Sequence, residues 1–317
     1  MRVLLHVERA DELVGRLAAR FPDIEVEACT SYDALGAALD GFRPNAQFHI
    51  RFEDRPYPGD ILLAAPSLDW IAVAGVGVDH LGPWDRQRLT VTNGAGVASH
   101  SMAWYVIAGI LALDMRFPHF MRAQARHAWQ PGFVGRPGGK TIAVVGLGNT
   151  GQAVAQKAAA LGLRVIGTRA RPRPMDHVDA VHGPDALHDV LAEADVVVVA
   201  TPRTAKTIGL LNRAAFAAVK PGAYLIDVSR GGVVEPAALV EALQSGRIAG
   251  AVIDVHDPEP MPADSALWDM ENVIVTPHSS AVYDGWERDA LDIFADNLAR
   301  RLAGEPLSNV VDPLRGY

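Results

Sequence analysis

Short apolar runs alternate with amphipathic segments along almost the whole chain. In the first third, the segments 11–20 and 31–40 carry apolar residues at helical spacing and predict helices, with Asp11 and Ser31 as their N-caps. Because strands that alternate with helices are joined by crossover connections, this part predicts a parallel sheet. Its expected strands are the Val- and Ile-rich runs at residues 2–7, 24–28, 46–50 and 70–75.

A second alternating series begins near residue 141, after a long helical pattern over 100–126 and a Gly- and Pro-rich loop over 130–140. A final helical pattern covers 283–302. The apolar runs of this series are almost continuous, as in strands that helices cover on both faces of a sheet. They occupy residues 141–146, 163–168, 194–201, 223–229, 248–255 and 272–278.

Length, charge and cysteine content narrow the class of protein. A chain of 317 residues is too long for one ordinary core and predicts two domains. The net charge of −8 argues against binding to nucleic acid or to an anionic membrane surface. The longest apolar stretch, 103–113, is shorter than the roughly 20 residues of a membrane helix. The one cysteine, Cys29, excludes an intrachain disulfide, so we expect a cytoplasmic protein; we expect no metal site.

Three glycines, Gly146, Gly148 and Gly151, stand in the spacing G-x-G-x-x-G directly after a predicted strand. The segment after them predicts an Ala-rich helix, which is the context that a dinucleotide-binding turn requires. The first glycine permits the tight turn, the second lets a pyrophosphate approach the backbone, and the third lets the helix lie close to the sheet. Asn149 and Thr150 open the helix, where backbone N–H groups bind phosphate.

The strand that follows ends at Thr168 and Arg169, where an NAD-specific site has Asp or Glu. An acid would repel a 2′-phosphate, whereas a guanidinium binds it through paired charge-assisted hydrogen bonds. Arg169, with Arg171 as a helper, therefore predicts a preference for NADP, with NAD as the alternative cofactor. The other interpretation is a solvated basic loop, and Arg164, at the start of the strand, belongs to that class.

Polar residues follow three later strands at their carboxyl ends, where ligands bind in open α/β sheets. Arg230 follows the first, Asp254 and Glu259 follow the second, and His278 follows the third. A histidine can supply the proton that a ketone needs during hydride transfer, and a carboxylate can align its ring. An arginine can bind a substrate carboxylate at two points. Together they predict an oxidoreductase that acts on a keto acid.

These residues lie in segments that resemble the D-isomer-specific 2-hydroxyacid dehydrogenase family, and the resemblance covers nearly the whole chain. It is carried by AVAGVGVDHL (72–81), by 91–113, by VSRGGVVEPAALVEALQSGRIAGAVIDVHDPEP (228–260) and by NVIVTPH (272–278). One departure is Trp104, since family members often have Glu there. The resemblance implies that Arg230 binds and orients the substrate and that His278, paired with Glu259, is the acid–base.

The resemblance also implies the remaining site residues. Asp254 would hold the nicotinamide carboxamide, and the substrate carboxylate would bind near Val76 and Gly77, with Arg51 in the same pocket. The other cofactor contacts that it implies are Thr201, Pro202, Thr207, Ser229 and Ser280.

The implied architecture has two doubly wound parallel-sheet domains. A flavodoxin-like substrate domain comprises residues 1–98 and 289–317, and a Rossmann cofactor domain comprises 99–288; a homodimer is a further family expectation. The implied activity is NAD(P)H-dependent reduction of a small 2-keto acid, of the glyoxylate or hydroxypyruvate type, to the D-2-hydroxy acid. Two alternatives stay open: a phosphite-type dehydrogenase on the same scaffold, and a nucleotide-sensing, corepressor-like binding protein. Glu259 argues against a formate-type enzyme, which usually has Gln there.

Overall fold

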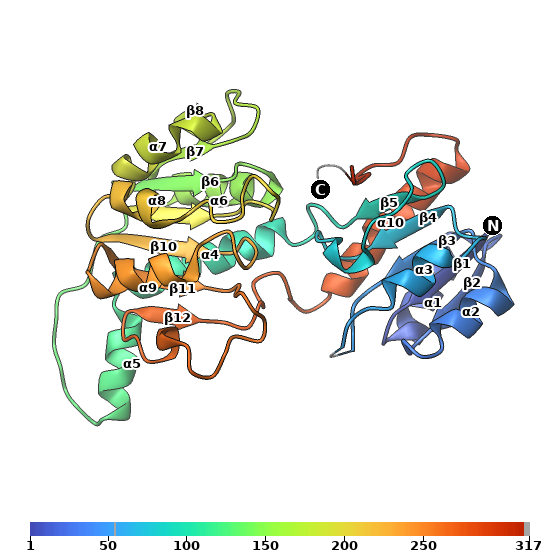
Figure 1. The fold of residues 1–317 in the computed structure, drawn as a ribbon, viewed down its shortest axis with the longest axis horizontal. Coiled ribbons are helices and arrows are strands. Elements are labelled where there is room, and N and C mark those ends of the chain that lie inside the picture. The colour runs from blue at the N-terminus through green and yellow to red at the C-terminus, as the bar shows by residue number, and fades with distance from the viewer. Residues whose placement is uncertain (54, 314–317) are drawn as a thin grey trace. The chain divides into compact units, whose positions relative to one another are not determined.

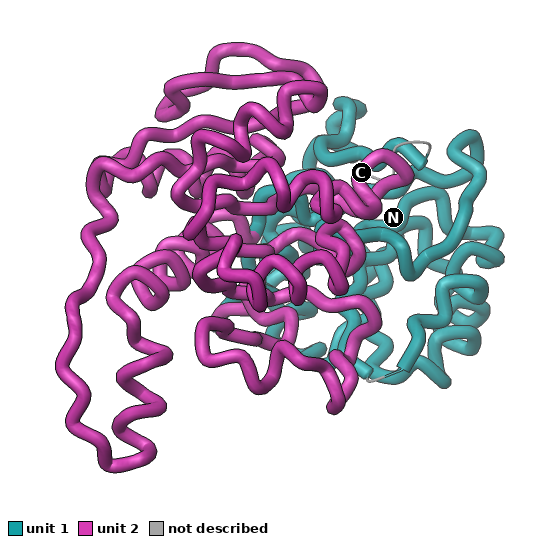
Figure 2. The backbone as a smooth tube through the Cα atoms, turned by 60° about the vertical axis from the view of Figure 1, so that its left-hand side comes forward, with its two compact units in different colours: residues 1–97, 284–317 teal, residues 98–283 magenta. Residues whose placement is uncertain are grey.

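A computed structural model of the chain describes residues 1–53 and 55–313. Within this part the chain divides into two compact units (Figure 2): unit 1 comprises Met1–Val97 and Asp284–Tyr317, and unit 2 comprises Ala98–Tyr283. Each unit contains a parallel sheet with helices on both faces (Figure 1). The α/β class predicted from the alternating pattern is therefore confirmed.

Unit 1 has the strand order β2-β1-β3-β4-β5, which is the order of flavodoxin-like sheets. Its strands are β1 (Arg2–His6), β2 (Glu25–Cys29), β3 (Ala46–His49), β4 (Trp70–Val73) and β5 (Thr90–Asn93). Its helices are α1 (Ala10–Arg20), α2 (Leu35–Phe42), α3 (Gly59–Ala64), the short 3-10 helix η1 (Asp79–Leu81) and α10 (Trp286–Leu302).

Two apolar layers cover the sheet of unit 1. Leu13 and Leu17 of α1 pack with Phe294 of α10 against one face, and Trp70 stacks on the Phe294 ring with their centroids 4.8 Å apart. Leu35 and other residues of α2 pack with α3 and η1 against the other face. The C-terminal helix α10 is therefore part of the core of unit 1, although its sequence follows unit 2.

Unit 2 has the strand order β12-β11-β10-β9-β6-β7-β8. The strands are added outward from β6 to β8 on one side, and the chain then returns to add β9 to β12 on the other side, so the strand order reverses between β6 and β9. This is the Rossmann arrangement extended by one strand, and the reversal is the point where dinucleotides bind. The strands are β6 (Thr141–Val145), β7 (Arg164–Thr168), β8 (Ala180–His182), β9 (Val196–Val199), β10 (Ala223–Asp227), β11 (Ile248–Ile253) and β12 (Val273–Val275).

The helices of unit 2 also form two layers. α4 and α6 pack on one face of the sheet, around Ile107, Val154 and Ile226. α7, α8, α9 and η3 pack on the other face. The helices are α4 (Ser99–Asp114), α5 (Phe117–Ala125), α6 (Asn149–Ala160), η2 (Pro184–Ala186), α7 (Leu187–Glu193), α8 (Arg213–Ala218), α9 (Pro236–Gln244) and η3 (Ala266–Trp268).

The predicted single helix over 100–126 is wrong, because it is broken into α4 and α5. The break lies at Met115 and Arg116, and Arg116 adopts a left-handed conformation with φ of 58°. Pro118 follows it in the first turn of α5, where a proline is tolerated. Beyond the break, α5 and the loop after it extend away from the sheet of unit 2 (Figures 1 and 2).

Both predicted N-caps are also wrong. α1 begins at Ala10, so Asp11 lies inside the first turn, where its charge still favours the helix dipole. α2 begins only at Leu35, and the Ser31 hydroxyl instead accepts a hydrogen bond from the Asp33 N–H at 3.2 Å. The helix predicted from 283 begins at Trp286. β5 and β8 were not predicted, since both are short and carry polar residues.

Within the described residues, no helix combines the length and hydropathy that crossing a membrane requires. In the same part of the chain, no three His, Cys, Asp or Glu side chains are grouped so as to hold a metal ion.

Candidate active site

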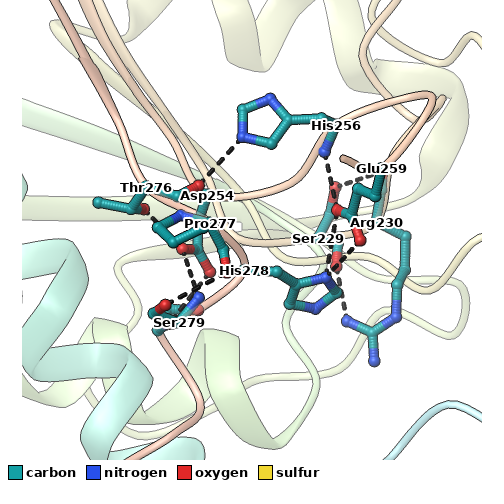
Figure 3. A network of polar contacts seen from close by, with 10 residues as sticks. Ser229, Arg230, Asp254, His256, Glu259, Thr276, Pro277, His278 and Ser279 are labelled. Carbon is teal, nitrogen blue, oxygen red and sulfur yellow. Dashed lines mark hydrogen bonds and ion pairs between the residues drawn. The ribbon is translucent and has the colours of Figure 1, made fainter. Parts of the chain in front are cut away.

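The polar residues that follow the later strands meet at one edge of the unit 2 sheet. β10, β11 and β12 are neighbours, with Asp227 paired to Ile253 and Ile253 paired to Val275 at their carboxyl ends. Arg230, Asp254 and His278 come directly after these ends, so the parallel register brings them to the same edge (Figure 3). Three positions that are distant in sequence thus form one cluster, as the strand pattern predicted.

His278 and Glu259 form the centre of this cluster. Nδ1 of His278 lies 3.1 Å and 3.0 Å from the two carboxylate oxygens of Glu259. A neutral imidazole that donates from Nδ1 carries its lone pair on Nε2, so this contact selects the tautomer. The ring is half-buried and its backbone has φ of 53°, a conformation that the Asp254 carbonyl stabilises by accepting the His278 N–H at 2.8 Å.

Glu259 is held in its ionised form. Partial burial acts to raise its pKa, but the hydrogen bonds from His278 and from the His256 N–H at 3.0 Å, with the charges of both histidines, lower the pKa below its ordinary value. The carboxylate therefore carries its charge beside the His278 ring at neutral pH. A fixed negative charge at Nδ1 favours the imidazolium form that a proton donor must reach.

Asp254 is fully buried and fixes the loop that carries His278. Its carboxylate accepts hydrogen bonds from the Thr276 hydroxyl at 2.6 Å and from the N–H groups of Ser279 and Ser280 at 2.8 Å and 3.0 Å. The Thr276 hydroxyl donates to Asp254, so it accepts from the Tyr105 hydroxyl of α4, 2.5 Å away. Asp254 therefore positions His278, a role that sequence reasoning did not assign to it.

Arg230 lies on the turn after β10, on the side of the network that also holds the His278 ring (Figure 3). Its guanidinium donates to the Ser229 carbonyl at 2.7 Å. The buried carboxylate of Asp227 anchors this turn, since its Oδ1 accepts from the Ser229 N–H at 3.0 Å and from the Ser229 hydroxyl at 2.6 Å. Burial raises the pKa of Asp227 to about 7, and the nearby charge of Asp254 adds to this effect.

The glycine turn has the geometry that its sequence predicted. Gly146 directly follows β6 with φ of 105°, and a Cβ there would lie 2.8 Å from the Ala200 carbonyl oxygen. A Cβ at Gly151 would lie 2.2 Å from the Gly146 carbonyl oxygen, so α6 approaches the strand as closely as it can. Around Gly148, in contrast, no described atom lies within 4 Å of an added Cβ. Asn149 and Thr150 open α6 beside this open space.

The arginines of β7 and of the loop after it lie in different environments. Thr168 is buried, and its carbonyl accepts the N–H groups of Gly146 and Leu147, which ties the end of β7 to the glycine turn. Arg169 comes next and is half-buried, with its guanidinium 3.4 Å from the Met175 sulfur. Arg171 is exposed. Arg164 forms an ion pair with Glu193 at 2.7 Å at the opposite end of β7.

The predicted cofactor edge after β9 lies across the strand reversal from the glycine turn. The hydroxyl of Thr201 is buried and has no hydrogen-bond partner among the described residues. Pro202 and Thr207 shape the loop that follows, since the Thr207 hydroxyl donates to the Pro202 carbonyl at 2.6 Å and accepts from the Thr204 N–H at 2.8 Å. An unpaired buried hydroxyl beside an open glycine turn fits a bound polar ligand.

The remaining predicted residues lie in unit 1. Val76 and Gly77 form the loop after β4, which is held by a hydrogen bond from the Asn93 amide to the Val76 carbonyl at 2.8 Å. Within residues 1–53 and 55–313, the N–H groups of Val76 and Gly77 have no hydrogen-bond partner. Arg51 is exposed, two residues after β3, and forms no ion pair in the same part of the chain. These donors are available to an anion.

Sequence reasoning missed the residues that hold the site in place. Asp227, Tyr105 and Thr276 form hydrogen bonds within the protein, and these contacts join positions up to 171 residues apart. A weak signal was present, because Asp227 and Thr276 stand at strand ends beside Arg230 and His278. No spacing in the sequence connects Tyr105 to them.

Comparison with known proteins agrees with this geometry. The sequence model of the family described as "D-isomer specific 2-hydroxyacid dehydrogenase, NAD binding domain" matches residues 107–280. D-3-phosphoglycerate dehydrogenase from Mycobacterium tuberculosis is 35% identical over 258 residues, which cover 80% of this chain and 48% of the relative. The chain thus spans about half the length of such curated relatives. Glyoxylate/hydroxypyruvate reductase A from Serratia proteamaculans is 30% identical over 97% of this chain and 96% of its own length.

Solved structures match along almost the entire chain. A D-isomer specific 2-hydroxyacid dehydrogenase from Xanthobacter autotrophicus, in complex with NADPH and MES, has a TM-score of 0.85 at 32% identity and covers 99% of both chains. An NADPH-dependent glyoxylate/hydroxypyruvate reductase from Sinorhizobium meliloti, in complex with NADP and sulfate, has a TM-score of 0.83 at 27% identity and covers 100% of this chain and 99% of its own. The chain belongs to the D-isomer specific 2-hydroxyacid dehydrogenase family of oxidoreductases.

Proposed function

We propose that this protein reduces a small 2-keto acid of the glyoxylate or hydroxypyruvate type to the D-2-hydroxy acid, with NADPH as the preferred reductant. The observation that carries the proposal is the contact of His278 with both carboxylate oxygens of Glu259, at the sheet edge that also holds Arg230. The similarity to the Serratia and Sinorhizobium reductases, which extends over nearly full length, supports the substrate class.

In this proposal His278 is the proton donor. Its Nδ1 donates to Glu259, so the proton that reaches the substrate leaves from Nε2, the nitrogen on the far side of the ring. Glu259 keeps the ring aligned and stabilises its positive charge before transfer. A bound nicotinamide supplies the hydride for the carbonyl carbon, and His278 protonates the carbonyl oxygen. General acid catalysis of this kind contributes about 10²- to 10⁴-fold to a rate.

Arg230 would hold the substrate in unit 2. The guanidinium of Arg230 binds the keto acid through its carboxylate and polarises the reacting carbonyl. Within unit 1, the N–H groups of Val76 and Gly77, which have no partner among the described residues, and the charge of Arg51 would bind a carboxylate. Ser229 positions Arg230 through its contacts with Asp227.

The cofactor residues fit a dinucleotide. The open space at Gly148 and the N–H groups at the start of α6, which Asn149 opens, accept the pyrophosphate. The buried Thr201 hydroxyl, at the same sheet edge, would form a hydrogen bond with the bound cofactor. Pro202 and Thr207 would contact the cofactor as well, Asp254 and Ser280 would hold its nicotinamide, and Thr168 would adjoin its adenosine ribose.

Arg169 would select NADPH. It lies after the strand end where NAD-specific proteins have an Asp or Glu that binds the adenosine ribose. Its positive charge would instead bind the 2′-phosphate of NADPH. A hydrogen bond to a charged group is worth about 1.5–3 kcal/mol, which corresponds to about one to two orders of magnitude in affinity. Arg171, which is exposed on the same loop, is the helper. NAD is then the weaker cofactor.

A homodimer fits the exposed apolar residues of unit 2. Trp129 and Phe133, on the loop after α5, are 96% and 97% exposed, which is unusual for large apolar side chains. Trp104 on α4 is also exposed, with the Lys157 ammonium 4.4 Å from its ring centre. A second copy of the chain would cover these exposed side chains, and light scattering tests the dimer.

We also propose a cytoplasmic location, because the chain has a lone cysteine and an acidic net charge.

A panel of keto acids tests the proposed function. Oxidation of NADPH is followed at the absorbance of the reduced nicotinamide with glyoxylate, hydroxypyruvate, pyruvate and 3-phosphohydroxypyruvate. We expect the first two to give the highest kcat/KM. Highest efficiency with 3-phosphohydroxypyruvate would instead assign the activity of a D-3-phosphoglycerate dehydrogenase, as the mycobacterial relative is named, and phosphite-dependent reduction of NADP would assign a phosphite-type enzyme. Binding of NADPH without turnover of any acid would support the binding-protein alternative.

A further inference from the structure

A continuous chain of buried polar side chains runs through unit 1 at the carboxyl edge of its sheet. His6 and His49, the last residues of β1 and β3, are both 0% exposed. Nδ1 of His6 lies 2.9 Å from the Tyr57 hydroxyl, which the Gln47 amide contacts at 3.2 Å. The other end of the Gln47 amide lies 3.1 Å from Nδ1 of His49. Nε2 of His49 lies 2.8 Å from Nε2 of His80.

A backbone carbonyl at one end of this chain fixes its direction. Nε2 of His6 lies 3.3 Å from the Ser31 carbonyl, which can only accept, so Nε2 of His6 donates. A neutral His6 then accepts at Nδ1, and the Tyr57 hydroxyl donates to it. The Tyr57 oxygen in turn accepts from the Gln47 N–H₂ group, as the amide orientation in the structure requires.

The hydrogen-bond direction from Gln47 to His80 follows from the Gln47 carbonyl. The Gln47 carbonyl accepts from Nδ1 of His49, so a neutral His49 carries its lone pair on Nε2. His80 must donate to that lone pair from its own Nε2. The lone pair of His80 therefore lies on Nδ1, for which the described part of the chain provides no partner. The Ser31 carbonyl thus determines the tautomer of His6, and the orientation of the Gln47 amide determines those of His49 and His80.

Burial keeps all three rings neutral, as this argument requires. Desolvation lowers the pKa of His6 to about 4 and that of His49 well below its ordinary value. The pKa of His80 is also lowered to about 4, by burial first and by the positive charge of Arg51 second, against the opposing charge of Asp79. At neutral pH the chain ends in a hydrogen-bond acceptor.

His80 is held in place at the edge where Val76 and Gly77 offer their N–H groups. It lies in η1, three residues after Gly77, and its ring is the half-buried end of the chain. The Tyr57 ring packs edge-on against His80 with centroids 5.3 Å apart and stacks on His49 at 4.3 Å. α3 packs against the backbone of η1 so closely that a Cβ at Gly59 would lie 2.7 Å from the His80 carbonyl oxygen.

We propose that His80 is a specificity-determining residue, whose Nδ1 lone pair accepts a hydrogen bond from a hydroxyl group on the carbon next to the keto group of the substrate. This inference rests on the proposed function, since the carboxylate must bind at Val76 and Gly77. The acceptor favours hydroxypyruvate, which has such a hydroxyl, over glyoxylate, which has none. A neutral acceptor also disfavours a second carboxylate at this position, because two sets of lone pairs face each other.

The first experiment measures kcat/KM for hydroxypyruvate and for glyoxylate and takes the ratio of the two. We expect His80→Leu to lower this ratio about tenfold, the value of one hydrogen bond. Tyr57→Phe cuts the chain without removing His80, and we expect a loss of about threefold, because the tautomer of His80 is no longer imposed. His188→Leu, at an exposed histidine of α7, is the control and leaves the ratio unchanged. An unchanged ratio in His80→Leu overturns the proposal.

The second experiment needs no turnover and no variant that must fold. Long-range ¹H–¹⁵N correlation spectra of the unmodified protein, labelled at histidine, report the tautomer of each ring at pH 7.5. We expect Nε2–H in His6 and His80 and Nδ1–H in His49, and a shift of the His80 Nδ1 signal on addition of D-glycerate but not of glycolate. A His80 that carries its proton on Nδ1, or a signal that neither acid moves, overturns the proposal. If the shift occurs while neither keto acid is reduced, the proposed function alone is wrong.

Discussion

Replacement of Asp227 by Asn should make the stability of unit 2 less dependent on pH. Asp227 is 2% exposed, and burial raises its pKa to about 7 from an ordinary value of 3.8. Its Oδ1 accepts both hydrogen bonds from Ser229, and an Asn carbonyl in the same place accepts them equally well. The substitution therefore removes the titration while it keeps the contacts that anchor the Arg230 turn.

The sign of the effect follows from the two pKa values. Between about pH 4 and pH 7 the folded protein keeps the Asp227 proton while the unfolded chain has lost it, so stability falls as pH rises through this window. Above pH 7 the stabilisation that protonated Asp227 provides is fully lost. Since each pH unit of difference corresponds to about 1.4 kcal/mol, the unmodified protein loses about 4 kcal/mol between pH 4 and pH 8 through this one group. The Asn variant lacks this loss.

Thermal unfolding at pH 4.5 and pH 8 measures the prediction. The Asn side chain at position 227 brings an N–H₂ group into the core, which lowers the free energy of unfolding by the same amount at both pH values. This contribution cancels when the Tm values of one variant at the two pH values are compared. For a unit of this size 1 kcal/mol shifts Tm by about 2–4 °C, so the Tm of Asp227→Asn relative to the unmodified protein should rise by about 10 °C between the two pH values. Asp185→Asn, at an exposed residue of η2, should show no such rise. If the Tm of the unmodified protein and the Tm of Asp227→Asn changed with pH in parallel, Asp227 would not titrate between pH 4 and pH 7.

Other substitutions probe the cofactor and the catalytic loop. Arg169→Asp should lower the NADPH/NADH ratio of kcat/KM about 100-fold, and Arg171→Asp less, as steady-state kinetics will show. Gly148→Ala should leave the Tm of the cofactor-free protein within about 2 °C but weaken NADPH binding in calorimetry, because its Cβ meets only the space for the ligand. Gly151→Ala should lower the Tm itself, because its Cβ lies 2.2 Å from a carbonyl oxygen. Thr276→Val should lower kcat about tenfold by freeing the loop that carries His278, while the circular dichroism spectrum stays unchanged.

The fold and the gathering of the candidate site residues at one sheet edge were predictable because they depend on local pattern. Apolar runs separated by helical patterns determine a parallel sheet, and residues just after strands must gather at its carboxyl edge. The candidates Arg230, Glu259 and His278 were selected in this way. The G-x-G-x-x-G spacing predicted the tight turn at Gly146 and the close approach of α6 at Gly151 for the same reason, since both features lie within six consecutive residues.

The contacts between distant segments were not predictable from pattern. The break between α4 and α5 depends on the left-handed Arg116. Pro118, two residues later, was a local signal of a helix boundary, but the helical pattern continues on both sides of it. Asp254 was expected to hold the nicotinamide carboxamide, which stays a prediction, and the structure shows its carboxylate bonded to the loop at 276–280. The histidine chain joins β1, β3 and η1, and each histidine by itself is indistinguishable from an ordinary core residue. Hydrogen-bond direction becomes visible only when the partners are known.

In the proposed function, His278 delivers the proton that completes reduction of the keto acid. The most direct measurement is kcat/KM for hydroxypyruvate in His278→Ala, together with the Kd for NADPH from fluorescence titration. We predict that kcat/KM falls about a thousandfold while the Kd for NADPH stays within about twofold of the unmodified value. Turnover by His278→Ala close to that of the unmodified protein, with the same acid and NADPH, would contradict the account.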